Sequence, residues 1–485
     1  MSPVKSHYLQ PTISLLRRNS QILRLLTAVI CISCPLPALA ASLPANELSL
    51  WWCLPFAGTL LSIAVCPLLL PNLWHLHSGK MIGLWCGLFL LPLSWHYGIS
   101  TGFTLTAHAL LEEYIPFMLL LLALYTLSGG IVIQYNSVGS IRLNVSLLAT
   151  GTLLAGLMGT TGAAMLLIRP LLRANAQRRH RTHVVVFFIF LVANIGGGLT
   201  PLGDPPLFLG FLKGVGFQWT LSHMLLPVLV NTLVLLLVFI CIDYCLWQHE
   251  PKAKAVRQLD SPMLTIQGKI NLLLLFAVTA VILLSGICKN TPVWHIYGLE
   301  ISLSAWLRNG LLVIITLCGL KLTSPKLRQQ NDFNWAPMQE VGKLFIGIFI
   351  TIAPVMALLQ LGTAGDFGVL LQLIQHNGEP VNAIYFWMSG LLSGFLDNAP
   401  TYLVFFNLAG GEAQLLMRYF SDTLLAISMG SVFMGALSYI GNAPNLMIKA
   451  IAEQQGIPMP SFFGYMAWSV TLLIPLFVLD TLLFF

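Results

Sequence analysis

The chain has 485 residues, of which 57% are hydrophobic and only 8% are charged, and its formal net charge is +7. Soluble domains carry about 25% charged residues, so this composition excludes a soluble protein. It indicates an all-α polytopic membrane protein, for which we expect the bacterial inner membrane. The basic residues fall in short loops between apolar segments. The positive charge therefore belongs to loops at the surfaces of the lipid bilayer, and no nucleic-acid partner is expected.

The first 40 residues are predicted to be a signal peptide. Arg17, Arg18 and Arg24 precede a short apolar run, and the residues at 38–40, Ala-Leu-Ala, match a small-residue cleavage site. The alternative is an uncleaved N-terminal anchor. The nine cysteines are scattered and show no Cys/His spacing typical of zinc, so neither a metal site nor a cofactor is expected.

Ten segments are apolar enough to cross a bilayer, which takes about 20 residues each. The first belongs to an N-terminal part, 41–79. The segments are 48–71, 81–98, 114–135, 183–213, 221–247, 269–288, 305–322, 343–361, 419–451 and 462–484.

Two further apolar stretches, 143–173 and 383–409, carry polar residues near their centres. The arginines from 173 to 181 make the loop after the first stretch cytoplasmic by the positive-inside rule. When the spans are counted outward from this loop, most other basic residues fall on the cytoplasmic side only if each of the two stretches returns to the side from which it enters. Both stretches are therefore predicted to be re-entrant hairpins.

The span 183–213 is predicted to be a broken helix. Its centre, residues 194–207, reads Asn-Ile-Gly-Gly-Gly-Leu-Thr-Pro-Leu-Gly-Asp-Pro-Pro-Leu, and these glycines and prolines do not fit a regular helix. A backbone group freed in lipid costs several kcal/mol if unsatisfied, so such a break is tolerated where it lines a cavity or binds a ligand. The alternative is a kink packed against protein.

The second half of the chain repeats the first at an offset of 238 residues. Residues 156–163 align with 394–401, and 200–206 align with 438–444. The repeats span 80–247 and 305–485, with a linker and connecting helix at 248–304 and a second broken helix at 419–451. One repeat starts inside and the other outside. Such inverted repeats are typical of secondary transporters.

The hairpin tips and the broken helices are predicted to meet near the bilayer midplane. Their carboxylate, amide and hydroxyl groups are hard oxygen ligands, suited to Na⁺ or to a proton-exchanging site. The candidate ion- or substrate-binding residues are Thr160, Thr161, Asn194, Thr200, Asp204, Asp397, Asn398, Thr401, Ser438, Asn442 and Asn445.

Asp204 and Asp397 are the main candidates for exchanging a proton for a cation, because burial disfavours the charged form of a carboxyl group. The alternative role of each is to cap a half-helix. Arg169 is a candidate for binding an anion, and the alternative is that it extends to the cytoplasmic surface.

Three segments, 194–206, 395–401 and 440–445, resemble the ion transporter superfamily, and the resemblance covers roughly residues 80–485. That superfamily includes NhaD-type sodium/proton antiporters, arsenite-pump membrane subunits, citrate–metal carriers and divalent anion/sodium symporters. The Leu-Asp-Asn-x-Pro tip at 396–400 looks like the NhaD type, whereas the first tip, 159–161, lacks the acid of that pattern. The resemblance implies a scaffold plus a moving transport part in each half, often in a homodimer.

Three functions follow, and the first is a sodium/proton antiporter with Na⁺ or H⁺ as the coupling ion. The second is a cation-coupled citrate or dicarboxylate transporter. The third is an anion-export membrane subunit that works with an ATPase. A membrane enzyme is not expected, because the chain shows no nucleophile–base arrangement and no soluble domain large enough for catalysis. The antiporter is favoured because the best-placed intramembrane ionisable groups are acids.

Overall fold

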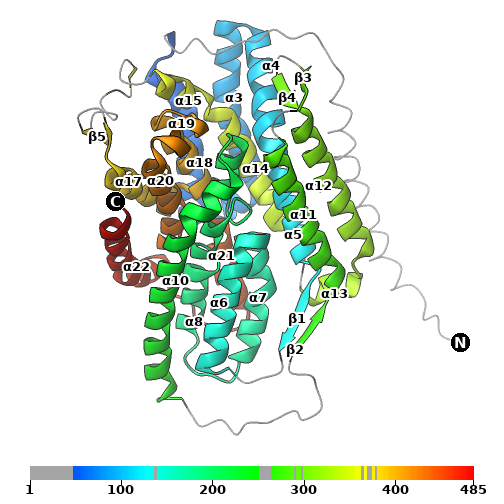
Figure 1. Cartoon of the computed structure of the whole chain (residues 1–485), viewed down its shortest axis with the longest axis vertical. Coiled ribbons are helices and arrows are strands. Elements are labelled where there is room, and N and C mark those ends of the chain that lie inside the picture. The colour runs from blue at the N-terminus through cyan, green and yellow to red at the C-terminus, as the bar shows by residue number, and fades with distance from the viewer. Residues whose placement is uncertain are drawn as a thin grey trace, which may run out of the picture.

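The structure is a computed structural model, shown in Figure 1. It describes residues 47–485 except 136–138, 251–263, 289–290, 297–298, 332, 362–364, 367, 369–373 and 377–378. The predicted signal peptide or anchor, 1–40, and part of the predicted linker lie outside these residues. Within them, nine helices are long and apolar enough to cross a membrane, or ten if one bent pair is a single span. This confirms the all-α polytopic membrane fold.

The elements run in four groups along the chain. The N-terminal group contains η2 (Leu50–Cys53), α2 (Leu54–Leu69), α3 (Pro71–Tyr97), α4 (Ile99–His108), the π-helical turn η3 (Ala109–Tyr114) and α5 (Ile115–Ser128). The first-half group contains β1 (Val132–Tyr135), α6 (Ile141–Met158), α7 (Thr160–Ala174), α8 (Thr182–Leu191), η4 (Ile195–Leu199), α9 (Pro205–Leu212) and α10 (Phe217–Trp247).

The connecting group contains β2 (Leu264–Gln267), α11 (Lys269–Ile287), β3 (Val293–Ile296), β4 (Leu299–Ser302), α12 (Leu303–Leu322), α13 (Pro325–Gln330), α14 (Ala336–Thr351) and α15 (Ala353–Gln360). The second-half group contains β5 (Gln375–His376), β6 (Glu379–Pro380), α17 (Asn382–Leu396), α18 (Asn398–Leu408), α19 (Ala413–Arg418), α20 (Ser421–Phe433), η6 (Met434–Leu437), α21 (Ala443–Gln454) and α22 (Phe462–Phe484).

Three features differ from the sequence-based layout. The span predicted to start at residue 114 starts at Ile99. The two acids just before residue 114 are accommodated in it because they are paired: Glu112 lies 3.0 Å from His108, and Glu113 contacts Lys213. The segment predicted as one span at 343–361 is the pair α14 and α15, bent by 41° where the second helix begins with a proline. Three two-stranded antiparallel sheets, β1–β2, β3–β4 and β5–β6, were not predicted.

The two broken helices form the centre of the molecule. The side chains of α8 are apolar on every face, and residues from His183 to Leu191 are all buried. In α20, every residue from Thr423 to Phe433 is buried as well. A helix that is apolar all round belongs inside a protein. These helices are therefore surrounded by other helices, which brings the two breaks together.

Helices from the two halves pack directly on one another: α18 packs on α9, and α21 on α7. Within the halves, α6 packs on α7, and α17 on α18 and α20. In Figure 1, β1, which precedes the first hairpin, lies near the bottom, whereas β5, which precedes the second, lies at the upper left. The two hairpins thus enter from opposite ends of the molecule. This arrangement agrees with the inverted repeat.

Candidate functional site

The two hairpin tips have the same backbone conformation. Gly159 lies at φ 80°, ψ 150° between α6 and α7, and Asp397 lies at φ 80°, ψ 144° between α17 and α18. The two positions are 238 residues apart in the sequence. Glycine adopts this conformation readily, whereas it costs any other residue about 1–3 kcal/mol. Asp397 is the one non-glycine residue with positive φ in the described ranges, so an acid is held at a place where glycine is easier.

A hydroxyl group ties each tip to the broken helix of its own half. The Thr200 hydroxyl donates to the carbonyl oxygen of Gly156, and the Ser438 hydroxyl donates to that of Gly394. In both cases the acceptor lies 44 residues earlier in the chain. The break is thereby fixed to the end of the hairpin. The same bond in both halves shows that the repeat extends to side-chain contacts.

Asp204 is the point where the two halves meet. Its carboxylate accepts hydrogen bonds from the hydroxyl of Thr160, at 2.9 Å, from the amide of Asn442, at 3.2 Å, and from the amide of Asn398. The side chain is 2% exposed. Thr160 belongs to the first tip, Asn398 to the second tip, and Asn442 to the second break. Three of the four predicted parts of the site therefore converge on the acid of the fourth.

A second set of amide contacts joins the breaks to each other. Asn194 donates to Asn445 Oδ1 at 2.9 Å, and Asn442 also donates to the carbonyl oxygen of Ala193 at 3.0 Å. Asn445 donates in turn to the carbonyl oxygens of Gly435 and Ser438, both at 2.9 Å. These groups satisfy backbone carbonyls that the helix breaks leave free.

Asp397 has a different environment. Its side chain accepts the backbone N–H of Asn398 at 2.8 Å, and Thr401 donates to its backbone carbonyl, also at 2.8 Å. Its carboxyl group lies within electrostatic range of Asp204. The Oδ1 of Asn398 is buried and has no hydrogen-bond partner among the described residues. Two acids and one unpartnered amide oxygen thus lie around the second tip.

The site contains acids but no paired base. Within the described ranges, no Lys, Arg or His forms an ion pair with Asp204 or Asp397. In the same ranges, no three His, Cys, Asp or Glu side chains are grouped to hold a metal ion. A cation bound here would therefore take its remaining ligands from neutral oxygens, such as hydroxyl, amide and backbone carbonyl groups.

Two candidate residues lie away from this centre or at its edge. Thr161 is half-buried in the first turn of α7, one residue after Thr160. Arg169 is nine residues beyond Thr160 on the same helix, which is about 13 Å along the helix axis. It interacts electrostatically with Tyr125 of α5. The structure does not bring Arg169 to Asp204.

The glycines at the breaks, predicted as helix breakers, also allow a close approach of two backbone segments, a role that was not predicted. The backbone N–H of Thr160 donates to the carbonyl of Gly203 at 2.8 Å, and a Cβ on Gly203 would lie 2.2 Å from the carbonyl oxygen of Gly197. The equivalent residues in the second half are Gly441 and Gly435, where the distance is 2.6 Å. The predicted alignment already contained Gly203 and Gly441, and the same offset of 238 also relates Gly197 to Gly435 just before the aligned segments.

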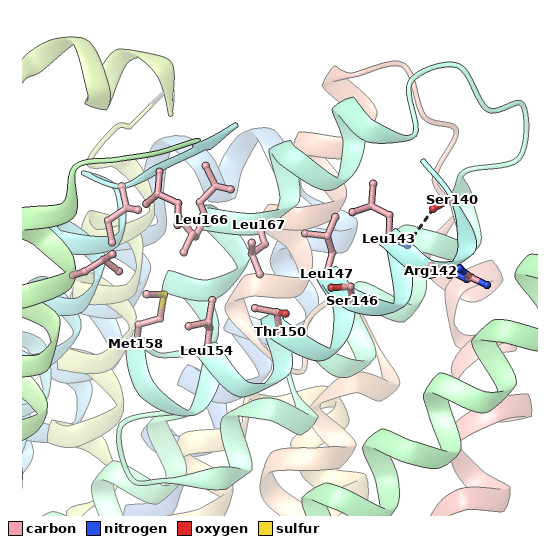
Figure 2. A pocket seen from close by; sticks show the side chains of 14 residues that line it. Ser140, Arg142, Leu143, Ser146, Leu147, Thr150, Leu154, Met158, Leu166 and Leu167 are labelled. Carbon is pink, nitrogen blue, oxygen red and sulfur yellow. Dashed lines mark hydrogen bonds between the residues drawn. The ribbon is translucent and has the colours of Figure 1, made fainter. Parts of the chain in front are cut away.

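A groove of about 550 Å³ lies beside the first hairpin, between α6, α7, β1–β2 and α11. Figure 2 shows the α6 side of this groove, from Arg142 past Ser146 and Thr150 to Met158. Most of the remaining lining residues are leucine and isoleucine, and neither central acid lines the groove. Its apolar lining suits a hydrocarbon chain better than a small ion. It is therefore separate from the candidate site.

The inverted hairpins, the paired helix breaks and the polar centre between them define a membrane transporter. The family model described as "Putative citrate transport" matches residues 45–485, so the chain belongs to that family. This match confirms the resemblance to citrate-transporter-like members of the ion transporter superfamily.

Two curated relatives are similar to the chain. They are "Uncharacterized transporter Mb2703" of Mycobacterium bovis and "Uncharacterized transporter Rv2684" of Mycobacterium tuberculosis. Each is 25% identical over 332 residues, which cover 67% of this chain and 72% of the relative. Both names describe transporters and specify no substrate.

Proposed function

We propose that the protein is a cation-coupled secondary active transporter, and that sodium/proton antiport is the activity its site supports best. One observation carries this proposal: the buried carboxylate of Asp204 accepts three neutral donors drawn from both halves and has no basic partner among the described residues.

The physical argument concerns the charge of this carboxylate. A buried ion without a partner of opposite charge is costly, and neutral hydrogen bonds offset only part of that cost. Either a proton or a small metal cation removes it. Because both act on the same oxygens, binding of one opposes binding of the other. Competition of this kind is the basis of an exchange of Na⁺ for H⁺.

Neighbouring oxygens fit a cation in this position. Asn398 Oδ1 is buried without a hydrogen-bond partner in the described part of the chain, and Asp397 carries a second carboxylate at the same tip. Amide and carboxylate oxygens are ligands that hard cations prefer. Rotation of the amides of Asn398 and Asn442 would replace donors with oxygen ligands around Asp204. The same side chains would then serve the protonated and the cation-bound states.

A second candidate is the cation-coupled transport of citrate or a dicarboxylate. The description of the family supports it. Because the centre is acidic and Arg169 is distant, an anionic substrate would depend on coupling cations bound at Asp204 and Asp397 to balance its charge. We further propose the bacterial inner membrane as the location, since the two relatives are mycobacterial transporters, and a homodimer as the assembly.

Everted membrane vesicles test the proposal. The vesicles are energised, Na⁺ is added, and internal pH is followed with a fluorescent dye. We expect Na⁺ to dissipate the pH gradient, and Asp204→Asn or Asp397→Asn to abolish this response. Asp422→Asn is the matched control, since Asp422 is an exposed acid at the start of α20.

Labelled citrate separates the two candidates in the same vesicles. Antiport is contradicted if Na⁺ leaves the pH gradient unchanged while citrate accumulates. Accumulation that requires Na⁺ or a pH gradient, and that Asp204→Asn abolishes, would establish the second candidate. Transport by both Asp→Asn variants at the rate of the parent protein would contradict the assignment of the coupling site itself.

A further inference from the structure

A buried acid outside the candidate site remains without a role. Asp480 lies near the end of α22, and its side chain is fully buried. Its Oδ1 accepts a hydrogen bond from the amide of Asn231 in α10, at 2.8 Å. These are the last helices of the second and first halves, so the contact joins the two repeats.

The orientation of the Asn231 amide is fixed by its other contact. The second N–H of this amide donates to the backbone carbonyl of Pro227, at 2.9 Å. A carbonyl oxygen only accepts, so the flipped amide would place two acceptors against each other. Both N–H groups of Asn231 are thereby used. Its Oδ1 needs a donor from elsewhere.

Two oxygens of this pair have no partner. Asn231 Oδ1 and Asp480 Oδ2 are both buried and make no hydrogen bond with any described residue. An ionised carboxylate offers only acceptors, whereas a protonated one offers one O–H donor. A single proton on Oδ2 would therefore supply the donor that Asn231 Oδ1 needs and would remove the unpaired acceptor of Asp480.

We propose that Asp480 holds a proton and donates it in a hydrogen bond to Asn231 Oδ1, so that two reciprocal hydrogen bonds link α10 to α22. The proton comes from water, and no covalent bond other than the new O–H is formed. The pair is a proton-binding site distinct from Asp204, and it ties together the outer helices of the two halves. Loss of this proton would leave both of these buried oxygens without a donor and would create a buried charge.

In the part of the chain that the structure describes, no Lys, Arg or His forms an ion pair with Asp480. Helix α22 packs on η6 and α10 and contacts α17, and near its start Tyr465 contacts Phe190 of α8 and Tyr439. On α10, His223 and Asp243 lie eight and twelve residues from the asparagine, or about 12 and 18 Å along the axis. The ionisable residues of α17 and of the rest of α22 are Tyr385 and Tyr465, and η6 has none. An ionised Asp480 would be unpaired among these elements, which is strongly unfavourable.

Infrared spectroscopy of the full-length protein in lipid tests the protonation directly. We expect the carbonyl band of a protonated carboxyl group at neutral pH, lost in Asp480→Asn but retained in Asp204→Asn. A spectrum in which Asp480→Asn removes only an ionised-carboxylate band would overturn the proposal. That outcome would also follow if a water molecule or cation bridged the two oxygens.

Thermal unfolding gives a second measurement. An asparagine at 480 presents an N–H group in place of the O–H, so Asp480→Asn should keep the melting temperature of the parent protein, while Asp480→Leu should lower it. The parent should also lose stability in alkaline buffer, and Asp480→Asn should not. An equal loss of stability in both variants would contradict the reciprocal pair. Neither measurement uses transport, so the failure of this proposal and the failure of the proposed function are distinguishable.

Discussion

The two halves of the molecule share a backbone and differ in where they carry their acid. Gly159 and Asp397 have the same dihedral angles, and Thr200 and Ser438 make the same bond to their tips. Yet the first half carries its acid on the broken helix, at Asp204, and the second carries it on the tip. The equivalent of Asp204 is an asparagine, and the equivalent of Asp397 is a glycine.

Because of this difference, the two acids have different surroundings, which a symmetric site would not give them. Asp204 is held by three side-chain donors, two of them from the opposite half. Asp397 is held by the backbone of its own turn and lies only half-buried. The repeated backbone gives both halves the same geometry, and the residue differences at equivalent positions decide where each acid lies. We therefore expect Asp397 to change its contacts more readily than Asp204.

The largest effect should come from filling the closest backbone approach. Gly203→Ala places a Cβ 2.2 Å from the carbonyl oxygen of Gly197, whereas the equivalent Gly441→Ala leaves 2.6 Å to that of Gly435. Overpacking costs about 1–3 kcal/mol, and more where the obstacle is backbone that cannot move aside. We expect loss of folded protein in size-exclusion chromatography for the first variant and a milder loss for the second. Gly83→Ala, with nothing within 4 Å of the new Cβ, is the control, and equal yields for all three would contradict this prediction.

The bonds that tie the tips to the breaks should be of similar importance in both halves. Thr200→Val and Ser438→Ala each remove a hydroxyl donor and leave a buried carbonyl unpaired, at a cost of about 1–3 kcal/mol. Melting temperatures in detergent measure the loss. A large fall in melting temperature for one variant and none for the other would mean that the two bonds do not contribute equally to stability.

Replacing the strained acid with the residue of the other half should stabilise the protein. Asp397→Gly puts glycine at φ 80°, as at Gly159, and releases about 1–3 kcal/mol of backbone strain. We expect a higher melting temperature together with loss of Na⁺-driven proton movement. Asp397→Asn, which keeps the strain, should lose transport without gaining stability. A variant Asp397→Gly that still transports would show that this carboxylate is not needed.

The smallest expected effect on stability concerns Glu250, which follows α10 at the end of the first half. Partial burial raises the pKa of Glu250, but hydrogen bonds from the backbone amides of Arg179 and His180 outweigh it, so the pKa is below its usual value. The carboxylate therefore stabilises the fold at pH values above its unfolded pKa, and this contribution is lost as pH falls through the lower folded pKa. Glu250→Gln should remove under about 1 kcal/mol at neutral pH and flatten the acid side of a stability–pH curve. An unchanged curve would contradict this role.

Sequence reasoning predicted the elements of the centre but not its contacts. The offset of 238 aligned both tips and both breaks, because the helix-breaking residues recur in each half. It did not predict that Asn398 crosses to Asp204, or that Asn194 pairs with Asn445, since those contacts depend on how the halves pack. The direction of Arg169 was open for the same reason. That these groups bind an ion stays a prediction.

The hydroxyl bonds of Thr200 and Ser438 also have a mechanical consequence. They join each tip to its break, and the amide contacts at Asp204 and Asn194 join the two breaks and tips to one another. A motion that opened the centre between its halves would have to give up all of these bonds at once. The cheaper motion carries the whole polar block past the surrounding helices as a rigid body. Under the proposed function, an ion held at this block would then change sides of the membrane without changing its ligands.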